Sequence, residues 1–238
     1  MAIMKDSAEG RKILDNIPVN LDVATVLERL KMRNGNKRVE GMIEELIEII
    51  TPVARPKVLY KISQVTSANG KTLEVDEVEF THHVPTLGFG EGERVFPYVA
   101  TCGLEVEAIV IPPSEAMKAY CLNIIKNVVL RSANNYFQEY LKQTYNLEEI
   151  SRIGPGEAMG TIAQQPKLFS ILGNVEESIG VKLTAHNMML PEKSNSGIFF
   201  ETSIKIESCQ LCPNDCRSRR APYDPELFKK FRSKPAAS

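Results

Sequence analysis

The chain has 238 residues, of which 43% are hydrophobic, so it can bury a core as one large domain or two small ones. Its 29 basic and 30 acidic side chains leave a formal net charge of -1. The chain therefore has no overall positive charge that would indicate nucleic-acid binding. No apolar run approaches the roughly 18 residues of a membrane span, and the N-terminus lacks a signal peptide's apolar stretch and cleavage site. We therefore expect a cytoplasmic protein that binds neither nucleic acid nor membrane.

Two helices are predicted near the N-terminus, at residues 21–33 and 37–50. Asn34-Gly35-Asn36 lies between them and is typical of a turn that ends a helix. Apolar residues recur at helical spacing on the second helix, at Val39, Met42, Ile43, Leu46, Ile47 and Ile50. These features predict an N-terminal helical hairpin, and we assign residues 1–55 to an N-terminal helical segment.

Strand-forming residues follow the helical segment. Residues 58–62 and 72–80 are rich in such residues and flank Asn69-Gly70, a dipeptide that indicates a β-hairpin. Residues 94–102 are typical of a buried strand that enters a turn at Gly103.

A long helix is predicted from Ser114 to about Tyr145, because it follows two prolines and carries an apolar stripe. Cys121 lies on this stripe and is expected to be a small buried hydrophobic residue. Residues 165–172 are also predicted to be helical.

The segment Ser151-Arg-Ile-Gly-Pro-Gly-Glu157 is a candidate ligand loop. Its glycines allow a ligand to approach the backbone closely, and its arginine can pair with a carboxylate or phosphate. By itself the pattern is also that of a common turn.

Three of the five cysteines, Cys209, Cys212 and Cys216, form a C-x2-C-x3-C motif near the C-terminus. Thiolates at this spacing can converge on one metal centre, and the thiols of a cytoplasmic protein stay reduced. The motif therefore predicts either an iron–sulfur cluster, such as 4Fe-4S, or a structural zinc. A disulfide with one spare thiol, or three unligated cysteines, remain the alternatives.

A series of short motifs lies within about residues 95–225: Arg-x-x-Pro-Gly at 152–156, Leu172, Val175-Glu176, the segments 179–184 and 189–191, and Ser194-x-Ser196-Gly197. In this order the motifs resemble the S-adenosylmethionine-binding activation domain of vitamin-B12-dependent methionine synthase. The cysteine motif, followed by Arg219-Arg-Ala-Pro-Tyr223, resembles that of short stand-alone members of the family.

The resemblance implies an α+β fold in which helices flank a twisted, mainly antiparallel sheet. Residues 56–207 would form the activation-like domain, and residues 208–238 a cysteine-rich basic tail. It also implies an accessory function, in which S-adenosylmethionine supports reductive methylation of cob(II)alamin. The partners would be a cobalamin-dependent methionine synthase without its own activation domain, or another corrinoid protein, and an electron-donor protein.

The resemblance assigns S-adenosylmethionine binding to Arg152, Gly154, Pro155, Gly156 and Glu157. Glu157-Ala158 replaces the Tyr-Pro of the family, and Asn135 stands where the family has a carboxylate on the long helix.

No catalytic acid or base is predicted, because methyl transfer to cobalt depends on proximity. His82, His83 and His186 are expected to serve local hydrogen bonds, and His186 is the one that could lie near the ligand.

Cys102 is a candidate fourth thiolate for the metal site if the fold brings it close, and Asp215 is another possible ligand. A cluster in the tail could receive the electron destined for cobalt. The alternative functions are a non-catalytic partner of a corrinoid protein and an iron–sulfur electron carrier.

Overall fold

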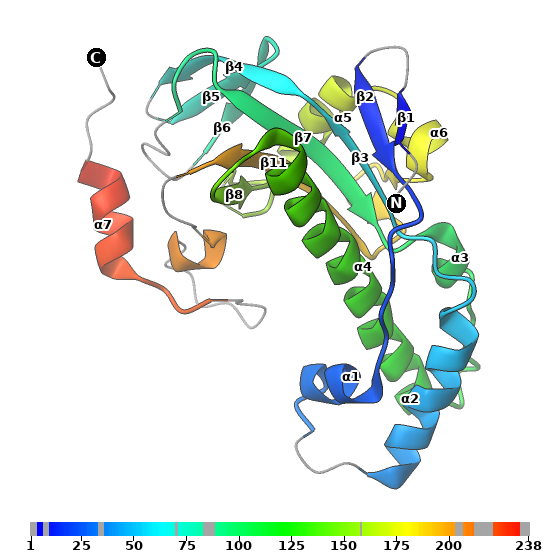
Figure 1. Cartoon of the computed structure of the whole chain (residues 1–238). Helices are drawn as coiled ribbons and strands as arrows, with labels where there is room; N and C mark the ends of the chain where they lie inside the picture. The colour runs from blue at the N-terminus through cyan, green and yellow to red at the C-terminus, as the bar shows by residue number, and fades with distance from the viewer. Residues whose placement is uncertain are drawn as a thin grey trace.

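Nine strands in the described part of the chain form one curled antiparallel sheet (Figure 1). The computed structural model describes residues 4–6, 10–32, 36–69, 71–82, 89–157, 159–202, 207–211 and 221–233. The strands are β1 (Met4–Asp6), β2 (Arg11–Leu14), β3 (Lys57–Lys61), β4 (Ser63–Asn69), β5 (Thr72–Val75), β6 (Val78–Thr81), β7 (Arg94–Thr101), β8 (Ile150–Ile153) and β11 (Ser194–Glu201). Their order is β1-β2-β3-β7-β4-β5-β6, and β11 pairs with both β7 and β8. Strands β9 (Lys182–Leu183) and β10 (Met189–Leu190) form a separate pair.

The helices lie on both faces of the sheet and extend beyond it (Figure 1). They are α1 (Val23–Arg29), α2 (Lys37–Ile50), α3 (Leu104–Glu107), α4 (Ala116–Tyr145), α5 (Gln165–Leu172), α6 (Val175–Ile179) and α7 (Pro225–Ser233), with 3-10 helices η1 (Ile162–Gln164) and η2 (Ser208–Leu211). No helix in the described ranges is both long and apolar enough to cross a membrane.

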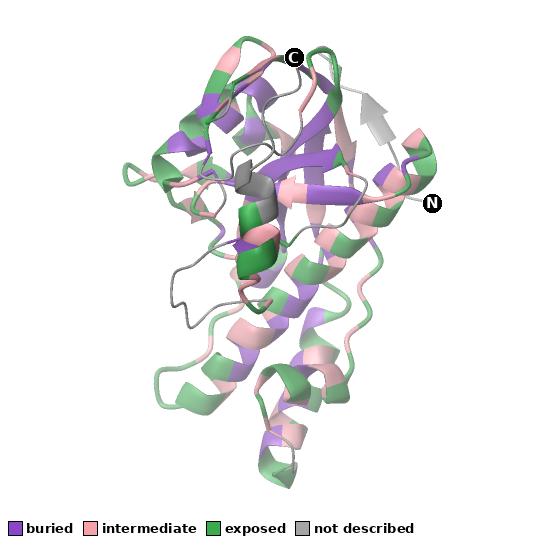
Figure 2. Cartoon of the chain, turned by 90° about the vertical axis from the view of Figure 1, so that its left-hand side faces the viewer, coloured by how far each residue is buried: buried purple, intermediate pink, exposed green. Residues whose placement is uncertain are grey.

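Strand β7 is the centre of the sheet, and Figure 2 shows its surroundings as largely buried. Val95 and Val99 belong to the hydrophobic cluster that includes α5 and α6, whereas Phe96 and Tyr98 pack with α4 on the opposite face. Burial on both faces explains why the sequence here is continuously apolar. Pro97 lies opposite the break between β3 and β4, where the ladder is interrupted and a missing N–H costs least.

Helix α4 connects the sheet to the helical extension (Figure 1). Its C-terminal half packs Phe137 and Leu141 against the sheet, and its N-terminal half packs Cys121, Ile125 and Val129 against α1 and α2. The burial of Cys121 confirms its predicted place in the core.

The fold class expected from the sequence is confirmed, because helices flank a mainly antiparallel sheet and the N-terminal part of the chain contributes the two helices α1 and α2. The predicted elements 94–102, 114–145 and 165–172 correspond to β7, α4 and α5. The first predicted helix, 21–33, is shorter than expected. It begins after Asp22, whose carboxylate caps it by accepting from the backbone N–H of Thr25 at 2.8 Å.

The predicted turn at Asn69-Gly70 lies between β4 and β5, with Asn69 opposite Thr72; Gly70 itself lies outside the described residues. The prediction that residues 58–62 form the first arm of this hairpin is wrong, because they correspond to β3, which pairs with β2 and β7. The prediction of a single strand at 72–80 is wrong. Asp76 and Glu77 both adopt positive φ, at 48° and 67°, so the chain turns back between β5 and β6. This backbone conformation suits a two-residue hairpin turn, although Asp-Glu is not its usual sequence.

Strands β1 and β2 were not predicted, and they join the main sheet through β3 rather than belonging to the helical hairpin. The domain limits at residues 55 and 207 stay predictions.

Candidate functional site

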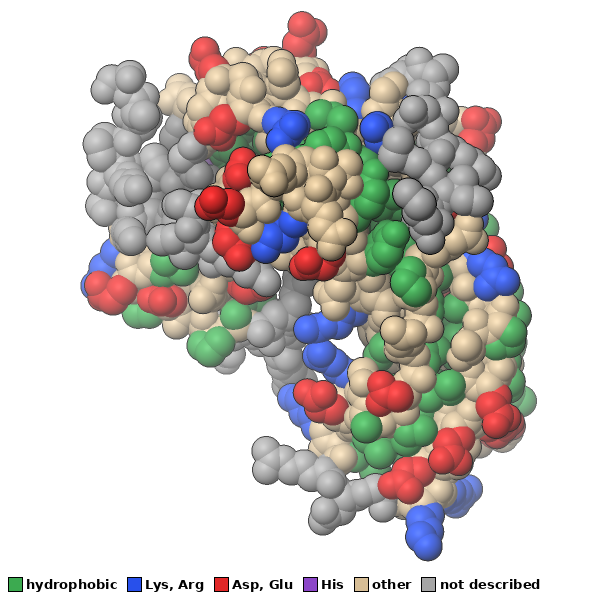
Figure 3. All heavy atoms as spheres, viewed as in Figure 1, with side chains coloured by type: hydrophobic (Ala, Val, Ile, Leu, Met, Phe, Trp, Pro, Cys, Tyr) green, Lys and Arg blue, Asp and Glu red, His purple; other side chains and the backbone are tan. Residues whose placement is uncertain are grey.

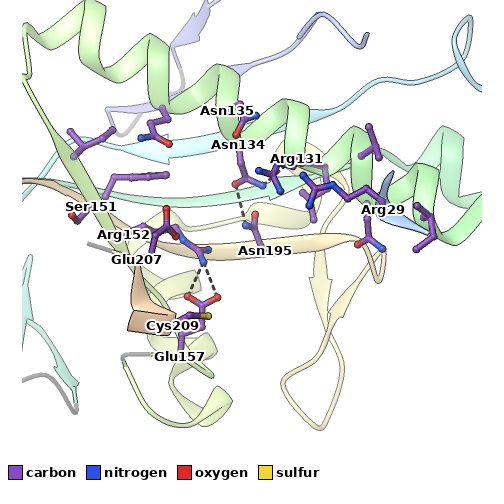
Figure 4. Close-up of a pocket in the computed structure, with 17 residues that line it drawn as sticks. Arg29, Arg131, Asn134, Asn135, Ser151, Arg152, Glu157, Asn195, Glu207 and Cys209 are labelled. Atoms are coloured by element: carbon purple, nitrogen blue, oxygen red, sulfur yellow. Dashed lines mark hydrogen bonds and ion pairs between the residues drawn. The ribbon is translucent and has the colours of Figure 1, made fainter. Parts of the chain in front are cut away.

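A pocket of about 770 Å³ opens between α4 and the β8–β11 edge of the sheet (Figure 4). Its walls come from five regions far apart in sequence: the end of α1, the middle of α4, β8 with the following loop, β11, and η2 of the C-terminal segment. Figure 3 shows the molecule hollowed on this side, with basic side chains at the hollow. The volume lies within the range of roughly 300–1,000 Å³ that is typical of small-molecule sites.

Arg152 lies on β8 and is held by two groups of the protein itself. Its Nη2 donates to both carboxylate oxygens of Glu157, at 2.8 and 2.7 Å, and its Nη1 donates to Tyr98 Oη at 3.1 Å. Burial lowers the pKa of Arg152, but the contacts with Tyr98 and Glu157 outweigh this effect and raise the pKa above the ordinary value of arginine. The guanidinium is therefore fixed in its charged form, and Glu157 is its counter-ion.

The segment 151–153 was expected to belong to a loop, and this is wrong, because it forms β8 and pairs with β11. Arg152 stands directly opposite Phe199, which also lines the pocket. The turn proper begins at Gly154, where an added Cβ would lie 2.8 Å from the carbonyl oxygen of Ser196. Gly156 has a φ of 80°, which favours glycine. Gly154 thus allows the turn to lie against β11.

Polar amides from α4 and β11 line the pocket wall opposite the turn. Asn135, which the sequence resemblance aligns with a carboxylate, is exposed there and lines the same pocket as Arg152 and Glu157. Its neighbour Asn134 accepts a hydrogen bond from Asn195 of β11 at 3.1 Å (Figure 4). Arg152 and Glu157 of the predicted ligand turn therefore meet the long-helix position in one cavity, whereas Gly154, Pro155 and Gly156 are not among the residues that line it.

Comparison with solved structures finds a crystal structure described as the MetH reactivation domain bound to AdoHcy. The two chains superpose with a TM-score of 0.54 at 16% sequence identity, over 79% of this chain and 78% of the other. This chain has the fold of the MetH reactivation domain. At this identity the likeness shows the fold alone. No protein-family model and no curated protein matches the sequence.

The cysteines predicted to bind a metal lie in different surroundings. Cys209, on η2, is half-exposed and lines the pocket beside Glu157 (Figure 4). Cys102 follows β7 and lies buried in the hydrophobic cluster of α1, α2 and α4, where burial raises the pKa of its thiol to about 12. Cys212, Cys216 and Asp215 lie outside the described residues.

No group of three His, Cys, Asp or Glu in the described ranges could hold a metal ion. The metal assignment therefore stays a prediction for the motif as a whole. Because Cys102 is enclosed by apolar side chains and Cys209 lines the pocket, the part of the chain described gives Cys102 no support as a shared ligand.

Histidines do not line the pocket in the described residues. His82 is buried near β6, and His186 is exposed in the turn between β9 and β10, so the idea that His186 lies near the ligand gains no support. His83 lies outside the described residues.

The pocket residues that were not identified from the sequence include Arg29, Arg131, Asn195 and Glu207. Asn195 lies within the Ser194-x-Ser196-Gly197 motif, so that motif was the one available signal. Arg29, Arg131 and Glu207 lie on three separate segments that only the tertiary fold brings to the pocket.

Proposed function

We propose that this protein binds S-adenosylmethionine in the pocket between α4 and β8 and supports the reactivation of a corrinoid protein. The observation that carries the proposal is the convergence of Arg152, Glu157 and Asn135 on one cavity, in a fold shared with a reactivation domain that binds AdoHcy. AdoHcy is what remains of S-adenosylmethionine after methyl transfer, so one site would suit both compounds. The volume of about 770 Å³ also suits a ligand of this size.

The reaction would be a one-electron reduction followed by alkylation. Cob(II)alamin takes up one electron to give cob(I)alamin, whose electron pair attacks the S-methyl group. The cobalt–carbon bond forms, the carbon–sulfur bond breaks, and S-adenosylhomocysteine leaves with the bonding pair. The corrinoid belongs to the partner protein, and a low-potential electron-donor protein would supply the electron. The contribution of this chain would be to hold the donor methyl group against cobalt.

The cysteine motif would bind a metal next to this pocket, since Cys209 lines the pocket wall. An iron–sulfur cluster held by Cys209, Cys212 and Cys216 would supply a one-electron carrier, whereas a zinc would fix the C-terminal segment in place. Analysis of anaerobically purified protein for iron, acid-labile sulfide and zinc distinguishes these two metals.

Isothermal titration calorimetry with S-adenosylmethionine tests the binding step. We expect saturable binding to the native protein and a loss of binding in Asn135→Leu, whose larger apolar side chain would fill part of the pocket. Glu139→Leu is the matched control, because Glu139 is exposed on the same helix and does not line the pocket. An absence of heat with native protein at near-millimolar ligand would exclude the proposed function.

The reactivation step needs a separate assay. An oxidised cobalamin-dependent methionine synthase without its activation domain, supplied with a reductant and S-adenosylmethionine, should regain activity with native protein and not with Asn135→Leu.

A non-catalytic partner of a corrinoid protein is the second candidate. Two features favour it: Arg152 is paired with Glu157, and residue 135 is an amide rather than a carboxylate. Both features differ from the pattern of the family that the sequence resembles. Association with the corrinoid protein without any restoration of activity would support this candidate over the first.

A further inference from the structure

Two arginines that the family resemblance does not assign extend into the same pocket (Figure 4). Arg29 is the last residue of α1, and Arg131 lies in the middle of α4. Both are exposed, and neither makes a hydrogen bond or ion pair with any described residue. Two uncompensated guanidinium groups at one concave surface create a positive potential that favours an anion.

The carboxylates of the pocket do not neutralise this pair. Glu157 is engaged with Arg152, and Figure 4 shows Glu207 at the opposite end of the pocket from Arg29. An oxyanion of a ligand would therefore find Arg29 and Arg131 available and Arg152 occupied. Arginine suits this role because its planar fork of N–H donors matches the oxygens of a carboxylate or phosphate.

An acceptor for a cation lies on β11 in the same pocket. Asn134 Nδ2 donates to the carbonyl oxygen of Leu130 at 2.9 Å, so Asn134 Oδ1 is the atom that accepts from Asn195 Nδ2 at 3.1 Å. This pair of bonds fixes the orientation of the Asn195 amide. Asn195 Oδ1 is consequently left buried with no hydrogen-bond partner among the described residues. Such an atom is costly unless a donor, for example an ammonium group, binds to it.

Two guanidinium groups and an amide oxygen that have no partner among the described residues lie in one pocket. They match an amino-acid group, which carries a carboxylate and an ammonium. We propose that Arg29 and Arg131 hold the α-carboxylate of S-adenosylmethionine and that Asn195 Oδ1 accepts from its α-ammonium. This inference rests on the proposed function and deepens it. It moves recognition of the carboxylate from Arg152, which the protein's own Glu157 already occupies, to α1 and α4.

Calorimetry with S-adenosylmethionine and its decarboxylated analogue tests the assignment. Arg131→Ala and Arg29→Ala should each raise the Kd for S-adenosylmethionine by about tenfold or more, as expected for the loss of a charge-assisted hydrogen bond. Neither should weaken binding of the decarboxylated analogue, which retains the ammonium. The analogue thus separates a lost carboxylate contact from a general disturbance of the pocket. Arg38→Ala is the matched control, because Arg38 is exposed on α2 and does not line the pocket.

Equal binding of S-adenosylmethionine by the native protein and both variants would overturn the subsite and leave the proposed function intact. An equal loss for both ligands would also overturn it, because the carboxylate would then make no difference. If the native protein binds neither ligand, the proposed function fails and pyrophosphate becomes the probe. Binding of pyrophosphate that Arg131→Ala weakens would support an oxyanion subsite at these arginines, and binding that it leaves unchanged would exclude one.

Discussion

The guanidinium of Arg152 is paired with groups of the protein itself, Glu157 and Tyr98. The side chains of Arg152 and Glu157 are only 16% and 24% exposed, and a cation in such surroundings needs a counter-ion and hydrogen-bond acceptors. Glu157 and Tyr98 supply both. The two residues are five positions apart, at the end of β8 and in the following turn, so the ion pair also ties the turn to the strand. The departure from the family pattern at Glu157 thus has a structural consequence.

A double-mutant cycle measures how strongly this pair is coupled. Glu157→Gln removes the negative charge and leaves the guanidinium partly buried without a counter-ion, so we expect it to lower the free energy of unfolding by about 1–3 kcal/mol. Arg152→Met combined with Glu157→Gln should lower the free energy by less than the sum of the two single changes. Urea denaturation of the native protein, both single variants and the double variant gives the coupling energy. Additive effects would show that the pair does not contribute as a unit.

At the scale of elements, the close approach of β8 and β11 positions one wall of the pocket. The approach requires glycine on both sides. A Cβ on Gly197 would overlap the carbonyl oxygen of Ile153, and a Cβ on Gly154 would lie 2.8 Å from that of Ser196. Both glycines belong to the motifs that carry the family resemblance. Close backbone packing accounts for Gly154 and Gly197 in the described structure.

Gly197→Ala should therefore displace β8 from β11 and move Arg152 with it. We expect a loss of about 1–3 kcal/mol in the free energy of unfolding, as is typical of overpacking a core, together with weaker binding of S-adenosylmethionine. Gly41→Ala is the control, because an added Cβ on this exposed residue of α2 meets nothing within 4 Å. It should instead stabilise the protein by about 0.4–1 kcal/mol. Unfolding and calorimetry would contradict the argument if Gly197→Ala behaved like Gly41→Ala.

On the scale of the whole molecule, sequence patterns predicted the elements whose signals are local. Three elements can each be predicted from a few neighbouring residues: the apolar stripe of α4, the continuous apolar run of β7 and the Asn69-Gly70 turn. Strands β1 and β2 carry no comparable signal, since they are short and are placed by pairing, β2 with β3 and β1 with β2. The β5–β6 turn was missed because Asp76 and Glu77 adopt positive φ, a conformation that this dipeptide does not usually indicate.

The candidate site was only partly predictable for a related reason. Arg152 and Asn135 were identified by their places in motifs, whereas Arg29 and Arg131 belong to no motif and matter only because α1 packs beside α4. A charge that lacks a partner can be recognised only once its neighbours are known. The sequence could therefore suggest which ligand to expect, and the tertiary structure was needed to suggest which residues hold its charged end.

The C-terminal segment joins the pocket through η2, and the reactivity of its first cysteine should report on this arrangement. Alkylation depends on exposure and on the thiolate fraction. Burial raises the pKa of the Cys102 thiol from its ordinary value of 9.0 to about 12, which lowers its thiolate fraction about a thousandfold at neutral pH. Burial also raises the pKa of Cys121. In metal-free native protein, iodoacetamide should thus modify Cys209 much faster than Cys102 or Cys121, and peptide mass spectrometry would measure the three rates.

Because Cys209 lines the pocket, saturating S-adenosylmethionine should slow the modification of Cys209 and leave the two buried thiols unaffected. A rate at Cys209 that does not respond to the ligand would mean that S-adenosylmethionine occupies a different surface or that the C-terminal segment does not border the pocket in solution.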